Sequence, residues 1–140
     1  MKTGSIGFIG GGRITRIFLQ AFRDSGREFG KIAVYDPDPD QLGKLETIHY
    51  HIKTDSASME SAARCDIVFL AVHPPVMMDT LSGIRPFLSN ESIVVSLCPK
   101  ITIEKISGKL MNLRAIARVN PGAPGIISQG INPVAFSGDM

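Results

Sequence analysis

The chain has 140 residues, of which 44% are hydrophobic and 20% are charged, a composition typical of a folded domain rather than of a disordered chain. Fifteen Lys and Arg residues against thirteen Asp and Glu residues leave a formal net charge of +2. Because there is no run of like charges, no aromatic platform and no apolar run of about 18 residues, we expect no binding to nucleic acid and no membrane span. Two cysteines are too few for a disulfide framework, so a cytoplasmic location is expected.

The N-terminal part of the chain predicts a strand, a glycine turn and a helix. Residues 5–9 form a short apolar run that ends in three glycines, which is typical of a buried strand. Hydrophobic residues then recur at helical spacing and make one apolar face, which comprises Ile14, Ile17, Phe18, Ala21 and Phe22. Gly26 ends this helix, and residues 32–35 predict a second strand. Asp38 followed by Pro39 predicts the N-cap and first position of a second helix.

The rest of the chain continues to alternate between the two kinds of element. Further strands are predicted at residues 50–52, 67–72, 93–97, 115–119 and 134–136. Helices are predicted at residues 58–63, 76–84 and 102–110, and a Gly/Pro-rich loop at residues 120–125. Continuous apolar strands separated by helices indicate a parallel sheet that is covered on both faces. The predicted fold class is therefore α/β, a Rossmann-type, doubly wound and mostly parallel sheet formed by residues 1–140 as one domain.

The glycine turn has the pattern of a dinucleotide-binding fingerprint. Gly10 and Gly12 supply its G-x-G motif, directly after a strand and at the opening of a helix. The first glycine permits the tight turn, and the second allows a diphosphate to approach the N–H groups of the helix N-terminus. Thr15 stands where the pattern has Gly or Ala, so the fit is imperfect. A glycine-rich turn that holds no ligand is the alternative interpretation.

Asp36 follows the second predicted strand, where an acidic residue can accept hydrogen bonds from the adenosine ribose hydroxyls. A carboxylate at this position repels a 2′-phosphate and therefore favours NAD over NADP. A local turn role is the alternative, because Asp before Pro37 is ordinary turn chemistry. Arg13 can meet a phosphate, so NADP stays open as a cofactor.

Four stretches of the chain resemble the pyrroline-5-carboxylate reductase family. Residues 6–15 resemble its opening strand and glycine loop, and residues 67–74 resemble its fourth strand and the Val-Lys-Pro turn that follows. Residues 94–106 are similar to its fifth strand and helix start, and residues 118–129 to its Arg-Val-Met-Pro-Asn-Thr-Pro-Ala loop. The resemblance implies an NAD(P)-dependent oxidoreductase of proline biosynthesis, which transfers hydride from NAD(P)H to the cyclic imine 1-pyrroline-5-carboxylate and forms proline.

The resemblance adds further cofactor contacts to the glycine turn and Asp36, all at the edge of the sheet where an open α/β fold binds ligands. The complete expected set is Gly10, Gly11, Gly12, Arg13, Ile14, Asp36, Ser58, Ala71, Val72, His73, Pro74 and Cys98. The nicotinamide is expected near Cys98 and residues 120–124. No catalytic residue is assigned. No metal site is expected, because His49 and His51 have no carboxylate or thiol partner nearby.

Three departures from the family carry chemistry of their own. His73 replaces a Lys and can donate a proton near neutral pH, although a cofactor-loop residue without chemistry is the alternative. Cys98-Pro99-Lys100 replaces Ala-Ala-Gly, so that Cys98 is either a reactive thiolate or a small buried filler. Lys100 either attracts a phosphate or carboxylate or is an exposed loop lysine. Asp36 stands where NADP-using relatives have Asn or Ser.

The resemblance also implies a second, helical domain for dimerisation and substrate binding, which is absent from residues 1–140. We therefore expect dinucleotide binding but little turnover from this chain alone, and a homo-oligomer stays open. Two alternatives remain at this point. One is a non-catalytic nucleotide-binding or regulatory module, and the other is a related NAD(P) dehydrogenase with another substrate, such as a deazaflavin-dependent NADP reductase or a prephenate dehydrogenase.

Overall fold

The computed structural model describes residues 3–26, 28–48, 51–110, 115–119 and 134–136. The strands are β1 (Thr3–Ile9), β2 (Phe29–Tyr35), β3 (Ile52–Asp55), β4 (Ile67–Leu70), β5 (Ile93–Ser96), β6 (Ala115–Val119) and β7 (Val134–Phe136). The helices are α1 (Arg13–Ser25), α2 (Pro39–Glu46), α3 (Glu60–Ala63), α4 (Pro74–Ile84) and α5 (Ile103–Lys109), and a 3₁₀ turn, η1 (Arg85–Phe87), follows α4. Within this described part of the chain, no helix combines the length and apolar character needed to cross a membrane.

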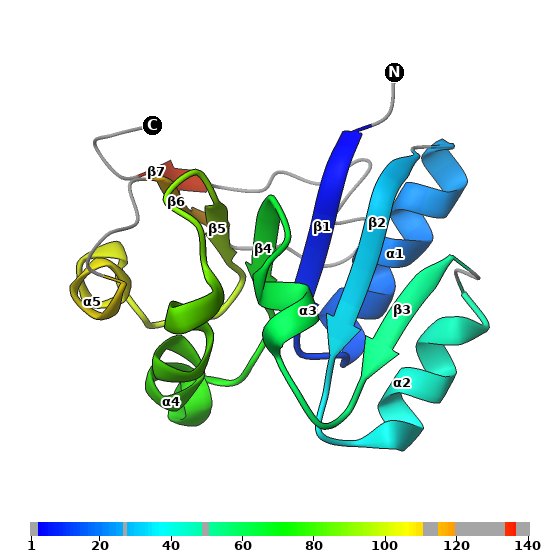
Figure 1. Ribbon diagram of the computed structural model, residues 1–140, viewed down its shortest axis with the longest axis horizontal. Coiled ribbons are helices and arrows are strands. Elements are labelled where there is room, and N and C mark those ends of the chain that lie inside the picture. Colours follow the sequence, from blue (N-terminus) through cyan, green and yellow to red (C-terminus); the bar gives the residue numbers. More distant parts are fainter. Residues whose placement is uncertain (1–2, 27, 49–50, 111–114, 120–133, 137–140) are drawn as a thin grey trace.

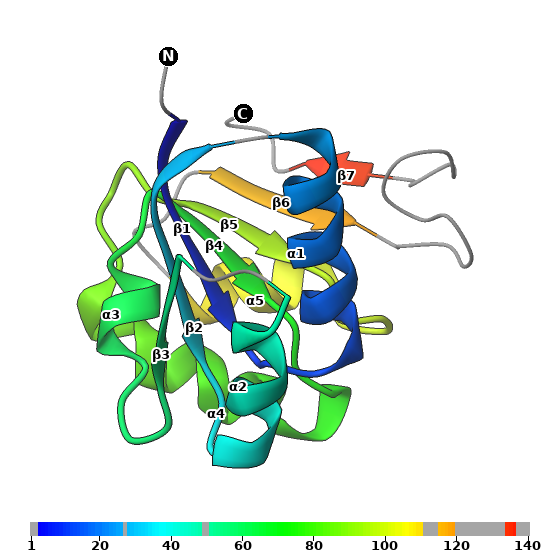
Figure 2. The same ribbon diagram turned by 90° about the vertical axis from the view of Figure 1, so that its right-hand side faces the viewer.

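The strands form one sheet in the order β3-β2-β1-β4-β5-β6-β7 (Figure 1). All neighbours are parallel except β7, which pairs antiparallel with β6 at the edge. Figure 2 shows α1 and α2 on one side of the sheet and α3 and α4 on the other. The predicted doubly wound, mostly parallel sheet is therefore confirmed. The chain order reverses between β1 and β4, which is the switch point where such sheets bind ligands.

Each face of the sheet buries its own apolar cluster. On the α1 and α2 side, Phe8 is fully buried and its ring stacks on that of Phe69, with 4.8 Å between the ring centroids. On the other side, α4 and α5 contribute Met77, Leu81 and Ile106 to a cluster with strand residues of β4, β5 and β6. Burying apolar side chains on both faces stabilises a parallel sheet and holds its strand ends in fixed positions.

α3 packs directly on the backbone of β1. A Cβ placed on Gly7 would collide with the carbonyl oxygen of Ala62, the third residue of α3. Only a glycine permits this approach, because the obstacle is main chain and cannot rotate away. Gly7 therefore sets the distance between a central strand and the helix that covers it.

Several predicted boundaries differ from the observed ones. The third strand is present but lies further along the chain than the predicted residues 50–52, since β3 runs from Ile52 to Asp55 and pairs Ile52 with Ile32 of β2. The strand predicted at residues 67–72 ends two residues earlier, as β4. α4 begins at Pro74 rather than at residue 76, because proline needs no N–H partner in the first turn of a helix. The loop predicted at residues 120–125 lies outside the described residues.

Candidate functional site

The candidate residues follow neighbouring parallel strands and so meet at one edge of the sheet. Gly10 follows β1, Asp36 follows β2 and Ala71 follows β4, and these three strands are adjacent. Cys98 follows β5, the next strand outward. In Figure 1 this edge lies at the lower end of β1 and β2. The structure therefore places the glycine turn, the acidic residue and the loop after β4 around the switch point.

Gly10 has a backbone that only glycine adopts without strain. Its φ is +111°, and a Cβ there would collide with the carbonyl of Ala71. The Gly10 N–H donates to the Tyr35 carbonyl at 2.8 Å, and the Ala71 N–H donates to the Ile9 carbonyl at 2.8 Å. The turn is thus fastened to both neighbouring strands, which explains glycine at position 10 by packing alone.

Thr15 fits the turn better than its position in the fingerprint suggests. The residue is fully buried, and its hydroxyl donates to the Gly10 carbonyl oxygen at 2.6 Å. The turn thus accommodates the extra side-chain atoms, which supply a hydrogen-bond partner for a buried carbonyl. In the sequence, the only sign of this contact is a threonine where the fingerprint has Gly or Ala, and the partner of its hydroxyl is seen only in the structure.

Gly12 is the N-cap residue of α1, and the helix has no side-chain cap and no acidic residue in its first turn. The φ of Gly12 is −84°, and no atom lies within 4 Å of a Cβ placed there. Arg13 is exposed and Ile14 half-buried at the start of the helix. An uncapped helix N-terminus presents N–H groups and a partial positive charge, which suits an anionic group.

Asp36 is half-buried and bonded through both carboxylate oxygens. Its Oδ2 accepts from the Gly11 N–H at 2.7 Å, and its Oδ1 accepts from the Asp38 N–H at 2.9 Å. The local turn role is therefore present in the structure. The ribose role stays a prediction, and it is compatible with these bonds because a carboxylate has about four acceptor positions.

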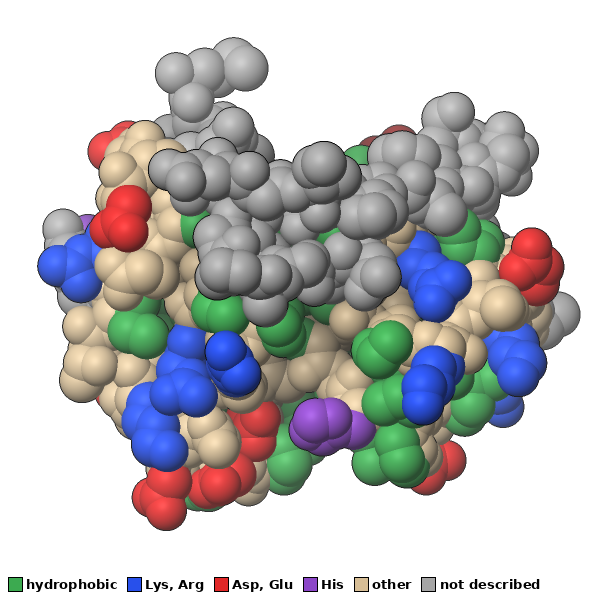
Figure 3. Space-filling model, turned by 180° about the vertical axis from the view of Figure 1, so that it is seen from behind, with side chains coloured by type: hydrophobic (Ala, Val, Ile, Leu, Met, Phe, Trp, Pro, Cys, Tyr) green, Lys and Arg blue, Asp and Glu red, His purple; other side chains and the backbone are tan. Residues whose placement is uncertain are grey.

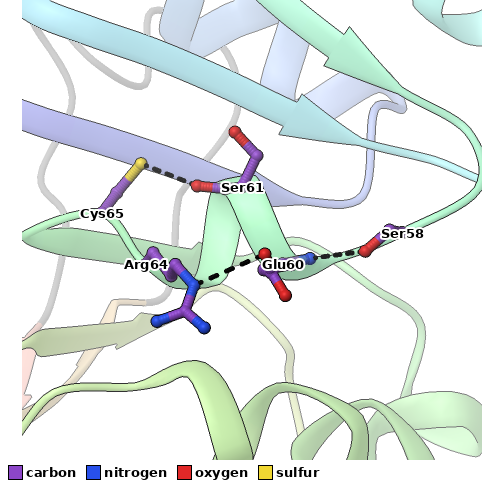
Figure 4. Close-up of polar contacts among 5 residues, drawn as sticks. All are labelled: Ser58, Glu60, Ser61, Arg64 and Cys65. Carbon is purple, nitrogen blue, oxygen red and sulfur yellow. Dashed lines mark hydrogen bonds and ion pairs between the residues drawn. The ribbon is translucent and has the colours of Figure 1, made fainter.

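Ser58 lies in the loop after β3, two residues before the first residue of α3 (Figure 4). Its Oγ accepts from the Glu60 N–H at 3.1 Å, and its own N–H donates to Asp55 Oδ1 at 3.0 Å. N–H groups of Ala57 and Ser58, both directed at the Asp55 carboxylate, lower the pKa of Asp55. The Ser58 side chain is exposed and therefore accessible to a ligand, and its contact with a cofactor stays a prediction.

The loop after β4 leads from the switch point into α4. Ala71, Val72 and Pro74 are half-buried, whereas His73 is exposed. His73 is the N-cap residue of α4, and its side chain makes no capping hydrogen bond. The Ala71 carbonyl and the Val72 side chain therefore lie beside Gly10, whereas the exposed His73 imidazole lies at the start of α4.

Cys98 is a buried thiol rather than a reactive thiolate. Only 2% of the residue is exposed, and its Sγ lies 3.6 Å from the Pro99 carbonyl oxygen. Burial raises the pKa of the Cys98 thiol, and the nearby charge of Arg118 opposes this only in part. The thiol stays protonated at neutral pH, which favours the interpretation as a small filler at the end of β5.

Lys100 has a left-handed backbone, with φ of 71°, at the position where the pyrroline-5-carboxylate reductase family that the sequence resembles has Gly. Lys100→Gly is expected to raise the free energy of unfolding by about 0.5–1 kcal/mol, because glycine adopts this conformation without strain. Lys100→Ala is the matched control, since it removes the ammonium but keeps the strained backbone. Denaturant unfolding followed by circular dichroism measures both, and an equal gain in the two variants would show that charge, not backbone, is responsible.

A groove between α1 and α2 carries basic side chains next to the candidate site. Arg16, Asp40, Gly43 and Lys44 are among its lining residues. Figure 3 shows Lys and Arg side chains gathered over this part of the surface, with Asp and Glu side chains close by. Within the described residues, neither Arg16 nor Lys44 forms an ion pair with a carboxylate. Likewise, the described part of the chain places no three His, Cys, Asp or Glu side chains around one metal position.

Comparison with known proteins confirms the predicted resemblance. The pyrroline-5-carboxylate reductase of Escherichia coli is 34% identical over 130 residues, which are 92% of this chain and 48% of that protein. The chain thus spans about half the length of the curated relatives it matches.

Solved structures share the fold. A pyrroline-5-carboxylate reductase from Coxiella burnetii superposes with a TM-score of 0.85 at 23% identity, covering 99% of this chain and 51% of that one. The pyrroline carboxylate reductase of Plasmodium falciparum, solved with NADP bound, gives 0.77 at 22% identity over 100% of this chain and 49% of that one. Residues 5–100, more than half of the chain, match the family described as NADP oxidoreductase, coenzyme F420-dependent. The chain therefore belongs to this family of oxidoreductases.

Proposed function

We propose that this chain binds a nicotinamide dinucleotide at the switch point and forms the cofactor-binding part of an oxidoreductase of the pyrroline-5-carboxylate reductase type. The empty space beside the Gly12 backbone is the observation that supports this proposal most directly. Glycine at positions 7 and 10 is required by collisions within the protein itself, but at position 12 the backbone is ordinary and the space for a Cβ is empty. A diphosphate that approaches the uncapped N-terminus of α1 explains why this space stays free.

The remaining contacts follow the strand order of the sheet. Asp36 at the end of β2 accepts hydrogen bonds from the adenosine ribose hydroxyls, and the N–H groups of the first turn of α1 bind the diphosphate. The nicotinamide then lies towards the ends of β4 and β5, where His73 and Cys98 are placed. The nicotinamide supplies the hydride when it is bound, so the task of this chain is to bind and orient it.

We infer a preference for NAD over NADP from the charges around Asp36. Asp36, Asp38 and Asp40 lie in one turn at the start of α2. The N–H groups at the start of α2 already have partners, because Asp38 Oδ1 accepts from the Asp40 N–H at 3.0 Å and the Asp38 carbonyl accepts from the Gln41 N–H at 3.2 Å. Pro39 has no N–H group, so none of these residues offers a free N–H group to a 2′-phosphate. Arg16 and Lys44, in the groove between α1 and α2, are the cations that oppose this preference.

The proposed substrate is the cyclic imine 1-pyrroline-5-carboxylate, by similarity to the relatives that share half their length with this chain. The family resemblance assigns substrate binding to the helical part of those proteins. We therefore expect the 140-residue chain to bind the cofactor and to show little imine-dependent oxidation of NADH or NADPH.

Gly12→Ala tests the proposal by separating the fold from the ligand. NADH binding, measured by its fluorescence, is expected to weaken about tenfold, because a methyl group enters the space of the diphosphate. Unfolding free energy should fall by no more than about 1 kcal/mol, the cost of alanine at an N-cap. Gly108→Ala is the control, since a Cβ there also meets nothing within 4 Å but the residue lies in α5.

Three outcomes contradict the proposal. If the wild-type chain binds neither NADH nor NADPH at millimolar concentration, the dinucleotide site is absent. If Gly12→Ala binds NADH as tightly as the wild type, the open space at position 12 has no role in binding. Equal effects of Gly12→Ala and Gly108→Ala on affinity lead to the same conclusion.

A further inference from the structure

We propose that Thr15 is a positioning residue for the cofactor site, acting through the peptide bond between Gly10 and Gly11. This inference rests on the proposed function. The Thr15 hydroxyl donates to the Gly10 carbonyl oxygen at 2.6 Å, and the Gly11 N–H donates to Asp36 Oδ2 at 2.7 Å. The carbonyl and the N–H belong to one planar unit, so the two bonds hold that unit from opposite ends.

The bond made by Thr15 is not the usual one for a threonine inside a helix. Such hydroxyls ordinarily bond to the carbonyl four residues earlier in their own helix. Thr80 in α4 does so, since its hydroxyl donates to the Val76 carbonyl at 2.8 Å. Thr15 instead contacts Gly10, which precedes the N-cap of α1 and follows β1. Its hydroxyl therefore links α1 to the glycine turn, whereas the Thr80 hydroxyl bonds within its own helix.

The hydrogen bond between Thr15 and Gly10 is shielded from water. Thr15, Gly10 and Gly11 are all buried, so the Gly10 carbonyl would have no water to replace the hydroxyl. Gly10, with its φ of +111°, also lacks the Cβ that restricts backbone rotation, so the peptide that follows it can rotate more freely than one after an ordinary residue. The two side-chain bonds remove that freedom and fix the direction of the Gly11 N–H.

The consequence is a mechanical link between the two parts of the dinucleotide site. Because the Gly11 N–H is bonded to Asp36, a diphosphate is left with the N–H groups of Gly12 and the first turn of α1. The same bond fixes Oδ2 of the carboxylate that is to hold the ribose. Thr15 thus keeps the ribose-binding residue of β2 and the diphosphate-binding end of α1 in register without contacting the cofactor.

Three variants test this role. Thr15→Val keeps the volume but loses the hydroxyl, and it is expected to weaken NADH binding about tenfold, equivalent to one hydrogen bond. Thr15→Ser restores the hydroxyl and should bind within about twofold of the wild type. Thr80→Val is the matched control, because it removes a hydrogen-bonded hydroxyl from another helix and should leave NADH affinity unchanged. All titrations are made at a temperature where circular dichroism shows each variant folded.

The Gly11 amide provides a readout that needs no cofactor. In two-dimensional NMR spectra, its proton signal is expected to lose the downfield shift of a carboxylate hydrogen bond, and its protection from hydrogen exchange, in both Thr15→Val and Asp36→Ser, in which the side chain is too short to reach the Gly11 N–H. Thr80→Val should leave this signal in place. A purely structural role of Thr15 would lower the melting temperature of Thr15→Val without changing the Gly11 amide or the NADH affinity.

The outcomes distinguish this inference from the function on which it rests. If the wild-type chain fails to bind NADH and NADPH, the proposed function is overturned, and the positioning role falls with it. If the wild type binds NADH and Thr15→Val binds it as tightly, only the positioning role of Thr15 is overturned. If Thr15→Val weakens binding while the Gly11 amide is unchanged, the route through this peptide is overturned.

Discussion

Gly7→Ala is expected to lower the free energy of unfolding by about 3 kcal/mol or more, a large share of the 5–15 kcal/mol typical of a domain. The added Cβ collides with the carbonyl oxygen of Ala62, which is main chain in α3. β1 cannot yield, because it lies in the middle of the sheet and pairs with β2 and β4. The strain must then displace α3 from its place against β1 and β2.

Gly4→Ala is the matched control for this prediction. It lies in the same strand, and its Cβ would also collide, but with the Oδ2 atom at the end of the Asp66 side chain. That side chain can rotate, so the cost is limited to its hydrogen bond from the Ser5 N–H and should stay near 1 kcal/mol, roughly the value of one such bond. Urea denaturation measures both variants. Similar losses in the two would show that α3 adjusts freely, contrary to the packing argument.

The features that sequence reasoning predicted correctly depend on neighbouring residues. Asp38 caps α2 with Pro39 at its first position, as predicted. The helix predicted from residue 102 is α5, and Thr102 is its N-cap, accepting from the Lys105 N–H at 3.2 Å. In each case a residue's own conformational preference and hydrogen-bonding capacity decide the outcome within one helical turn. The glycine turn was recognisable for the same reason, because a strand, two glycines and a helix follow one another directly.

The features that were missed depend on contacts between distant segments. β3 has one strongly apolar residue, Ile52, and its place is set by pairing with β2 rather than by its own pattern. The bond between Asp36 and the Gly11 N–H joins residues 25 positions apart, and no periodicity indicates it. The left-handed backbone of Lys100 was hidden by a residue type that seldom adopts it, although a Gly in the similar family marked the position.

Asp36→Asn is expected to reverse much of the preference for NAD, with NADH binding weakened about 10- to 100-fold and NADPH binding strengthened. The ribose hydroxyls lose hydrogen bonds to a charged acceptor, worth about 1.5–3 kcal/mol, and the 2′-phosphate no longer meets a negative charge. Asparagine is the informative replacement, because its carbonyl oxygen can still accept from the Gly11 N–H. Serine is too short to reach it and would release the glycine turn at the same time.

Asp38→Asn controls for the general effect of removing one negative charge from this turn. Asparagine caps a helix as well as aspartate does, so the N-terminus of α2 should remain intact. If Asp36 contacts the ribose directly, the ratio of the NADPH and NADH dissociation constants should fall far more in Asp36→Asn than in Asp38→Asn, as measured by calorimetric titration of both coenzymes. Equal changes in the two variants would mean that the turn acts through its net charge alone, and an unchanged ratio in Asp36→Asn would remove its ribose role, leaving Asp36 as the residue that holds the Gly11 N–H.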